Sequence, residues 1–375
     1  MRSLRRILYG KESIWLSSSA IIISPLIKNI IQHRNPHKSG IVIGRILNDT
    51  RVVFWDPMKA FNPHILIVGP TGSGKTETLI TILRRAHEIF GSTVLFVDIR
   101  GDIASRLMER GVYYHLIDIP RTSLNSLEPR NTTPWIRVYQ IFDSIIESYE
   151  INDLRLQGVL FEVLRRSYEK YDKPSWDDII TTLYEKDHDG LNGIIERILR
   201  EISSLDTEPG KGYEIRKGEM NVVTMRDLTK EREELLRYAI NIFFQDLINM
   251  ASREKPDSQV NIFLGLDEAW ILLSRRTSRR IVNLLRLARG YGISISMATQ
   301  SFKDFGELWD MIAENTGLLI VMSNPSKSFW AEASKFLRIG EKYLEDIMTI
   351  MRRGDAIIRI LPDPRAIPVS IDKDA

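Results

Sequence analysis

The sequence predicts an α/β protein with a mostly parallel central sheet and an inserted all-α segment. Apolar runs of strand length alternate with amphipathic helical stretches, which is typical of parallel sheets. A glycine-rich loop joins one of these strands directly to one of these helices. Only helical periodicity appears over most of residues 125–215, so we expect that range to be an all-helical insertion.

Length and composition limit the class of protein. The chain has 375 residues, of which 43% are hydrophobic, enough for one large core and a smaller inserted unit. It has no cysteine, which excludes disulfides, cysteine-ligated zinc and thiol nucleophiles. Its 52 basic residues nearly balance its 49 acidic residues. Any nucleic-acid surface must therefore be a local patch and not a property of the whole molecule.

The N-terminal segment, residues 1–38, admits three interpretations. Arg2, Arg5 and Arg6 precede an uncharged run from Ser13 to Ile27, which is short for a bilayer and diluted by serines. It fits a membrane span, an interfacial or partner-binding helix, or ordinary packing. No convincing cleavage site for a signal peptide follows. We expect a cytoplasmic protein, and peripheral association with or anchoring in the membrane through this segment stays open.

Residues 39–124 are predicted to form the first part of the core. The segment begins with a hairpin that turns at Asn48 and Asp49. The apolar strand 65–68 follows, then a helix with apolar residues at helical spacing, and then strands over 93–98 and 114–119. Inside the insertion, Ser175 followed by two carboxylates is typical of a helix start.

Residues 216–375 are predicted to return to the same sheet. A long helix follows the first returning strand. Together with the earlier strands these segments predict a sheet of about eight strands. The returning strands are expected at residues 220–225, 261–266, 293–298, 318–322 and 356–360.

A phosphate-binding loop is the strongest motif of the chain. Its pattern, G-x-x-x-x-G-K-[ST], lets successive backbone N–H groups surround phosphate oxygens at the positive end of the following helix. Lys75 adds charge for the β- and γ-phosphates, and the Thr76 hydroxyl can ligate Mg²⁺. The predicted nucleotide-binding residues are Gly69, Pro70, Thr71, Gly72, Ser73, Gly74, Lys75, Thr76 and Glu77.

Two adjacent carboxylates end the strand at 261–266. Asp267 is predicted to hold Mg²⁺ together with Thr76, and Glu268 to polarise the attacking water as a general base. Gln300 closes a neighbouring strand, where an amide can sense the γ-phosphate. The alternatives are purely structural: the acidic pair caps the following helix, and Gln300 is an ordinary polar residue at the end of a strand.

Several charged residues near these strands have less certain roles. Arg289 can reach the γ-phosphate site of a neighbouring subunit, or it can simply satisfy the carboxyl end of a helix. Asp98, Arg100 and Asp102 follow the second strand of the core, where they form either an ion-pair relay or ordinary loop structure.

A dense basic cluster follows the acidic pair along the chain. Such clusters bind phosphodiester backbones, although many are only solvated faces. We predict a DNA contact for this cluster. Its residues are Arg275, Arg276, Arg279 and Arg280.

The motif set resembles the HerA–FtsK superfamily of P-loop motors. The matching segments, in chain order, are GPTGSGKT at 69–76, FVDIRGD at 96–102, LDEAW at 266–270 and ATQS at 298–301. The last two, with Ala288-Arg289 between them, are most similar to ATPases and coupling proteins of conjugation and type IV secretion. The superfamily's second motif usually has Pro-Lys where this chain has Ile99-Arg100.

The resemblance implies a RecA-like core and a ring of six identical subunits that hydrolyse ATP, with Mg²⁺, between neighbours. It implies Lys75, Glu268, Gln300 and Arg289 as catalytic residues, the last acting in trans. It also implies DNA translocation in conjugation, DNA import or secretion, with a membrane or secretion-channel partner. A HerA-like repair translocase and a viral packaging motor are alternatives. A different class, a nucleotide-dependent assembly scaffold that moves no DNA, also stays open.

Overall fold

A computed structural model describes residues 40–119, 121–208, 210–228, 233–253, 260–269, 285–363 and 365–372. The segment 1–38 and the basic cluster at Arg275–Arg280 lie outside these ranges, so the predictions made for them stay predictions.

One mixed sheet forms the centre of the described molecule. It has eleven strands in the order β2-β1-β11-β10-β9-β3-β8-β7-β4-β6-β5. The strands from β9 through β3 to β5 are parallel, whereas β2, β1, β11 and β10 pair antiparallel. The bounds are β1 (Ile41–Ile46), β2 (Val52–Trp55), β3 (Ile65–Val68), β4 (Thr93–Asp98), β5 (His115–Asp118), β6 (Met220–Thr224), β7 (Ile262–Leu266), β8 (Ile293–Thr299), β9 (Leu318–Met322), β10 (Asp355–Ile360) and β11 (Ala366–Ile371).

Helices cover both faces of this sheet. Their bounds are α3 (Lys75–Phe90), α4 (Ile103–Glu109), α5 (Pro134–Ser148), α6 (Leu154–Lys170), α7 (Trp176–Tyr184), α8 (Asn192–Ser203), α9 (Glu233–Ser252), the 3₁₀ helix η3 (Phe302–Leu308), α11 (Trp309–Glu314), α12 (Lys327–Leu337) and α13 (Glu341–Met348). In β3, Ile65 and Ile67 pack with α3 and α4, whereas Leu66 and Val68 join the core shared with α9, α11, α12 and α13. The α/β class with a mostly parallel sheet is thus confirmed.

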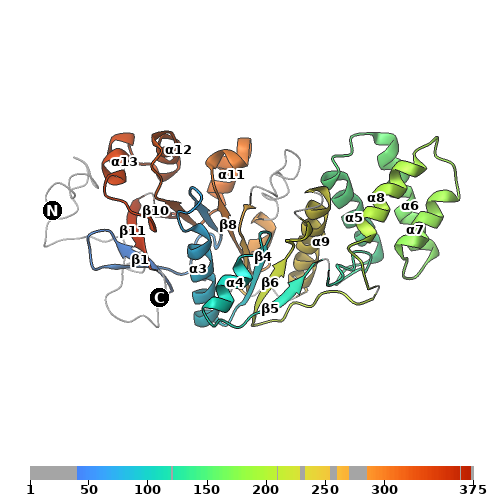
Figure 1. Cartoon of the computed structure of the whole chain (residues 1–375), viewed down its shortest axis with the longest axis horizontal. Helices are drawn as coiled ribbons and strands as arrows, with labels where there is room; N and C mark the ends of the chain where they lie inside the picture. The colour runs from blue at the N-terminus through green and yellow to red at the C-terminus, as the bar shows by residue number, and fades with distance from the viewer. Residues whose placement is uncertain are drawn as a thin grey trace.

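The helices α5 to α8 gather at one end of the molecule, beyond the β5 edge of the sheet (Figure 1). Ser175 caps α7 in a reciprocal capping box with Asp178, as the sequence predicts. A buried ion pair ties α5 to the core helix α9, because Arg137 donates to Asp246 Oδ1 at 2.7 Å. Removing one partner of such a pair typically costs about 3–5 kcal/mol, since the other charge is left buried and alone.

The predicted count of about eight strands is too low. The hairpin β1–β2 belongs to the same sheet, because β11 pairs with β1 on one side and β10 on the other. The sequence does not predict β11, since Pro368 lacks the N–H group that an interior strand position normally uses. In the structure the Pro368 carbonyl still accepts from the Leu47 N–H at 3.0 Å.

Candidate nucleotide-binding site

The phosphate loop lies between β3 and α3, at the carboxyl edge of the parallel strands. Gly72 and Gly74 have φ values of 81° and 105°, which side chains rarely tolerate, so the turn needs glycine there. Gly74 is the N-cap of α3, whose first residue is Lys75. Burial lowers the Lys75 pKa, and the Lys75 Nζ donates to the Pro70 carbonyl at 3.1 Å. The Lys75 ammonium thus lies against the loop at the amino end of α3, where the helix favours an anion such as phosphate.

Thr76 and Asp267 meet beside this loop and fit a magnesium site. The Thr76 hydroxyl donates to Asp267 Oδ2 at 2.7 Å, while Asp267 Oδ1 is buried with no hydrogen-bond partner among the described residues. Burial raises the Asp267 pKa, so a cation there would favour the ionised carboxylate. Mg²⁺ typically takes one or two protein oxygens and completes its shell with phosphates and water. The residues present therefore fit the ion.

Glu268 is held from both sides at the end of β7. Its Oε1 pairs with Arg100 at 2.6 Å, and its Oε2 accepts from the Gln300 amide at 3.2 Å. The Gln300 carbonyl in turn accepts from the Thr71 hydroxyl at 3.2 Å. The structure thus brings together the predicted base, the predicted sensor and the phosphate loop.

Three charged residues at the end of β4 and in the loop after it divide between structural and site roles. Asp98 is buried and accepts from four backbone N–H groups between Gly101 and Ala104, so it stabilises the loop that leads into α4. Burial raises the pKa of Asp98. Arg100 and Asp102 instead line the site, where Arg100 pairs with Glu268 and Asp102 pairs with Arg106.

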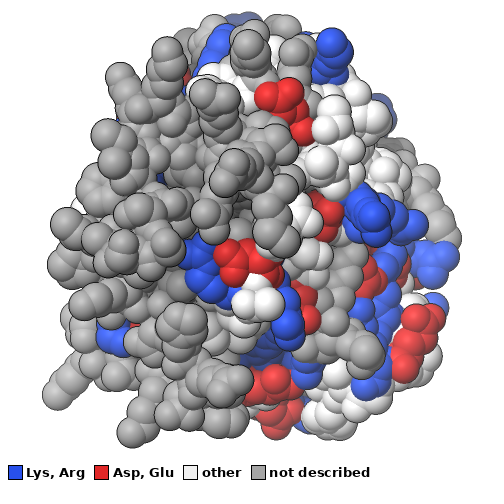
Figure 2. Space-filling view, turned by 90° about the vertical axis from the view of Figure 1, so that its left-hand side faces the viewer, with Lys and Arg blue, Asp and Glu red and all other residues white. Residues whose placement is uncertain are grey.

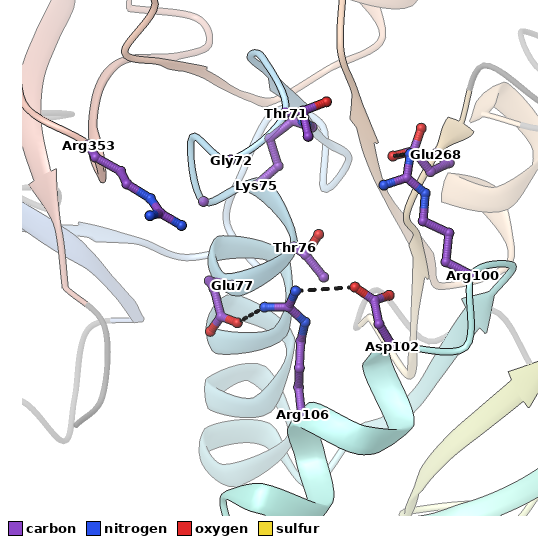
Figure 3. A pocket seen from close by; sticks show the side chains of 11 residues that line it. Thr71, Gly72, Lys75, Thr76, Glu77, Arg100, Asp102, Arg106, Glu268 and Arg353 are labelled. Atoms are coloured by element: carbon purple, nitrogen blue, oxygen red, sulfur yellow. Dashed lines mark hydrogen bonds and ion pairs between the residues drawn. The ribbon is translucent and has the colours of Figure 1, made fainter.

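A pocket of about 260 Å³ opens between these groups (Figure 3). Glu77 lines it, but the Glu77 carboxylate pairs with Arg106 and Arg110 of the neighbouring segment. Any contact from Glu77 to a phosphate would therefore come from its backbone N–H. The full lining is Thr71, Gly72, Gly74, Lys75, Thr76, Glu77, Arg100, Asp102, Arg106, Glu268 and Arg353.

Two pocket residues were not foreseen from the sequence. Arg106 of α4 bridges Glu77 and Asp102, and Arg353 reaches the pocket from the turn before β10. Nothing in the α4 sequence marks Arg106. For Arg353, a basic pair and a glycine just before a strand were the available signal.

Arg289 does not reach the pocket of its own chain. It lies among the helical residues that precede β8, whereas the phosphate loop lies past the other end of that strand, where Val68 pairs with Thr299. Its guanidinium lies 5.6 Å from the centre of the exposed Phe61 ring. Arg289 is therefore not among the residues that line the pocket.

Comparison with known proteins identifies the family of the chain. Residues 41–285 match the family described as Helicase HerA, central domain. The chain is 33% identical, over 99% of its length, to the DNA import protein CedB of Sulfolobus acidocaldarius, of which it spans 61%.

Two solved structures share the fold. VirB4 of Thermoanaerobacter pseudethanolicus superposes with a TM-score of 0.76 at 16% identity, covering 92% of this chain and 98% of that one. The plasmid coupling protein TrwB, solved with ADP and Mg²⁺, has a TM-score of 0.58 at 15% identity and covers 85% of this chain and 86% of its own. From the family match, the CedB identity and the phosphate loop, the chain belongs to the HerA–FtsK superfamily of P-loop NTPases, within the family of the HerA central domain.

Proposed function

We propose that this protein is a Mg²⁺-dependent ATPase that moves DNA. One observation carries the proposal: Thr76, Asp267, Glu268 and Gln300 surround the phosphate loop within hydrogen-bond distance of one another or of the loop. A metal pair, a base and a γ-phosphate sensor are what ATP hydrolysis needs. The similarity to a protein named for DNA import supports DNA as the cargo.

Hydrolysis follows from these side chains. Glu268 accepts a proton from a water molecule, whose oxygen forms a bond to the γ-phosphorus. The bond from that phosphorus to the β–γ bridging oxygen breaks, and ADP leaves with the electron pair. Lys75 and the N–H groups at the start of α3 stabilise the charge that develops on the phosphates. Thr76 and Asp267 would hold Mg²⁺, which neutralises phosphate charge when bound.

Assembly of the subunits into a ring would let Arg289 act on the site of a neighbouring subunit. Because Arg289 faces away from its own pocket, we infer that it reaches the γ-phosphate site of the next subunit, where a guanidinium can stabilise transition-state charge. The active species would then be a closed homo-oligomer, and we expect a hexamer.

None of the helices in the described part of the chain combines the length and the apolar character that a membrane span requires.

DNA would be held by a local basic patch. On the end of the molecule drawn in Figure 2, the described lysines and arginines are interspersed with acidic residues and form no single basic field. Our proposed contact is the cluster Arg275–Arg280, the densest group of arginines in the sequence, acting on the phosphate backbone without reading sequence.

The decisive experiment compares ATP turnover with and without double-stranded DNA. We expect DNA to raise the rate of ATP hydrolysis, because a DNA motor couples hydrolysis to movement along DNA. The variant Lys75→Ala should show no turnover in either condition, which excludes a contaminating ATPase. A parent rate that DNA does not change would contradict a DNA motor and favour an assembly scaffold.

A further inference from the structure

The arginines that line the pocket differ in whether they have a carboxylate partner. Arg100 pairs with Glu268, and Arg106 pairs with Glu77 and Asp102. Arg353 also lines the pocket, yet no hydrogen bond or ion pair of its side chain occurs with any described residue. An arginine without a counter-charge beside a phosphate site is available for an anionic ligand.

The turn that carries Arg353 is fixed by its own backbone. Asp355 accepts from the Arg352 N–H at 2.7 Å, and the Asp355 N–H donates back to the Arg352 carbonyl at 3.0 Å. Gly354 between them has a φ of 96°, which glycine tolerates best. The Asp355 carbonyl also accepts from the Ser323 N–H at 2.9 Å, which anchors the turn to the end of β9. These hydrogen bonds therefore fix the backbone position of Arg353.

The sheet order tells which part of a nucleotide Arg353 faces. β8 and β7, which deliver Gln300 and Glu268, lie on one side of β3, and β9 and β10 lie on the other. The γ-phosphate must face Glu268, because the attacking water needs that base. The remainder of the nucleotide therefore extends toward the side from which Arg353 comes, opposite Glu268 in Figure 3.

We infer that Arg353 binds the α-phosphate end of a nucleoside di- or triphosphate. The inference rests on the proposed nucleotide site and adds a ligand contact from the C-terminal part of the core. A guanidinium can make two parallel hydrogen bonds to phosphate oxygens. Since ADP and ATP share this end, Arg353 contributes equally to the binding of both and little to the chemical step.

The test measures ADP affinity by titration calorimetry with Mg²⁺ and no DNA. Arg353→Ala should weaken ADP binding by about tenfold to a hundredfold, as expected for a hydrogen bond to a charged group. A non-hydrolysable ATP analogue should lose affinity by the same factor, and Arg353→Lys should fall between. In steady-state hydrolysis the KM should rise while kcat stays near that of the parent.

Arg352 supplies a matched control. Both arginines are exposed, but Arg352 does not line the pocket, so Arg352→Ala removes the same charge from the same turn. Its ADP affinity should equal that of the parent. Unchanged ADP affinity in Arg353→Ala, or an equal loss in Arg352→Ala, overturns the inference and leaves the proposed function standing. A parent protein that binds no ADP overturns both.

Discussion

At Glu268 the backbone and the side chain are both constrained. Its φ is 64°, an uncommon value for a residue with a side chain, and its carboxylate is only 4% exposed. Such conformations persist where surrounding contacts over-determine them, and they cluster at functional sites. Here the contacts are those to Arg100 and Gln300. The left-handed turn gives the adjacent Asp267 and Glu268 different partners, Thr76 for the first and Arg100 with Gln300 for the second, as the separate metal and water roles proposed for them require.

Replacing the base without changing its shape isolates the chemical step. Glu268→Gln should keep nucleotide binding and slow hydrolysis by roughly 10²–10⁴-fold, because the amide cannot accept the proton of the attacking water. Single-turnover hydrolysis and ADP calorimetry measure the two effects separately. Lys75→Ala, in contrast, should lose affinity as well as rate. Normal hydrolysis by Glu268→Gln would assign the base to another residue.

At the scale of elements, His64 connects three segments at the edge opposite the pocket. Its Nε2–H donates to the Leu285 carbonyl at 2.6 Å, and its Nδ1 accepts from the Ile295 N–H at 3.0 Å. Burial, together with repulsion from Arg289, lowers the pKa of His64 to about 4. The neutral ring therefore ties β3 to β8 and to the helical residues that carry Arg289.

This histidine should make the protein sensitive to mild acid. In the unfolded chain His64 titrates near the ordinary histidine pKa of 6.5, whereas in the folded protein it resists protonation until about pH 4. The contribution of His64 to the free energy of unfolding is fully present above pH 6.5. It is lost as pH falls toward 4, at about 1.4 kcal/mol per pH unit. Equilibrium urea unfolding across this window measures the slope. His64→Gln cannot titrate, so its slope should be shallower; parallel curves for the two proteins would refute the assignment.

The strands and helices that bear the site were predictable from local patterns, but their spatial order was not. Apolar runs located β3 and β7, and the loop motif located Lys75 and Thr76, because these signals span only a few residues. Strand β11 was missed because Pro368 reads as a strand breaker. Arg353 was missed because its closeness to Gly72 depends on β9 and β10 pairing beside β3, a long-range fact that no local pattern records.

At the scale of the whole molecule, shared active sites can be tested by mixing subunits. Arg289→Ala and Glu268→Gln subunits should each be inactive in pure rings. Mixed rings should regain some hydrolysis, because some interfaces then combine an intact Glu268 with an intact neighbouring Arg289. Turnover measured across mixing ratios should peak at an intermediate composition.

Size measurements by light scattering at the assay concentration complete that experiment. The parent should be oligomeric under conditions where it hydrolyses ATP. A fully active monomer, together with no regained activity at any ratio of the two variants, would show that Arg289 serves no neighbouring site.

The position of β11 has a consequence for the timing of folding in the cell. Gly44 of β1 pairs with Ile371 of β11, so among the described strands the hairpin β1–β2 joins the rest of the sheet only through a strand synthesised long after it. Ribosomes add roughly 5–20 residues per second, so this pairing waits roughly 15–65 s after the hairpin is made. During that interval the β1 edge, with its unpaired backbone groups, must stay out of contact with other nascent chains.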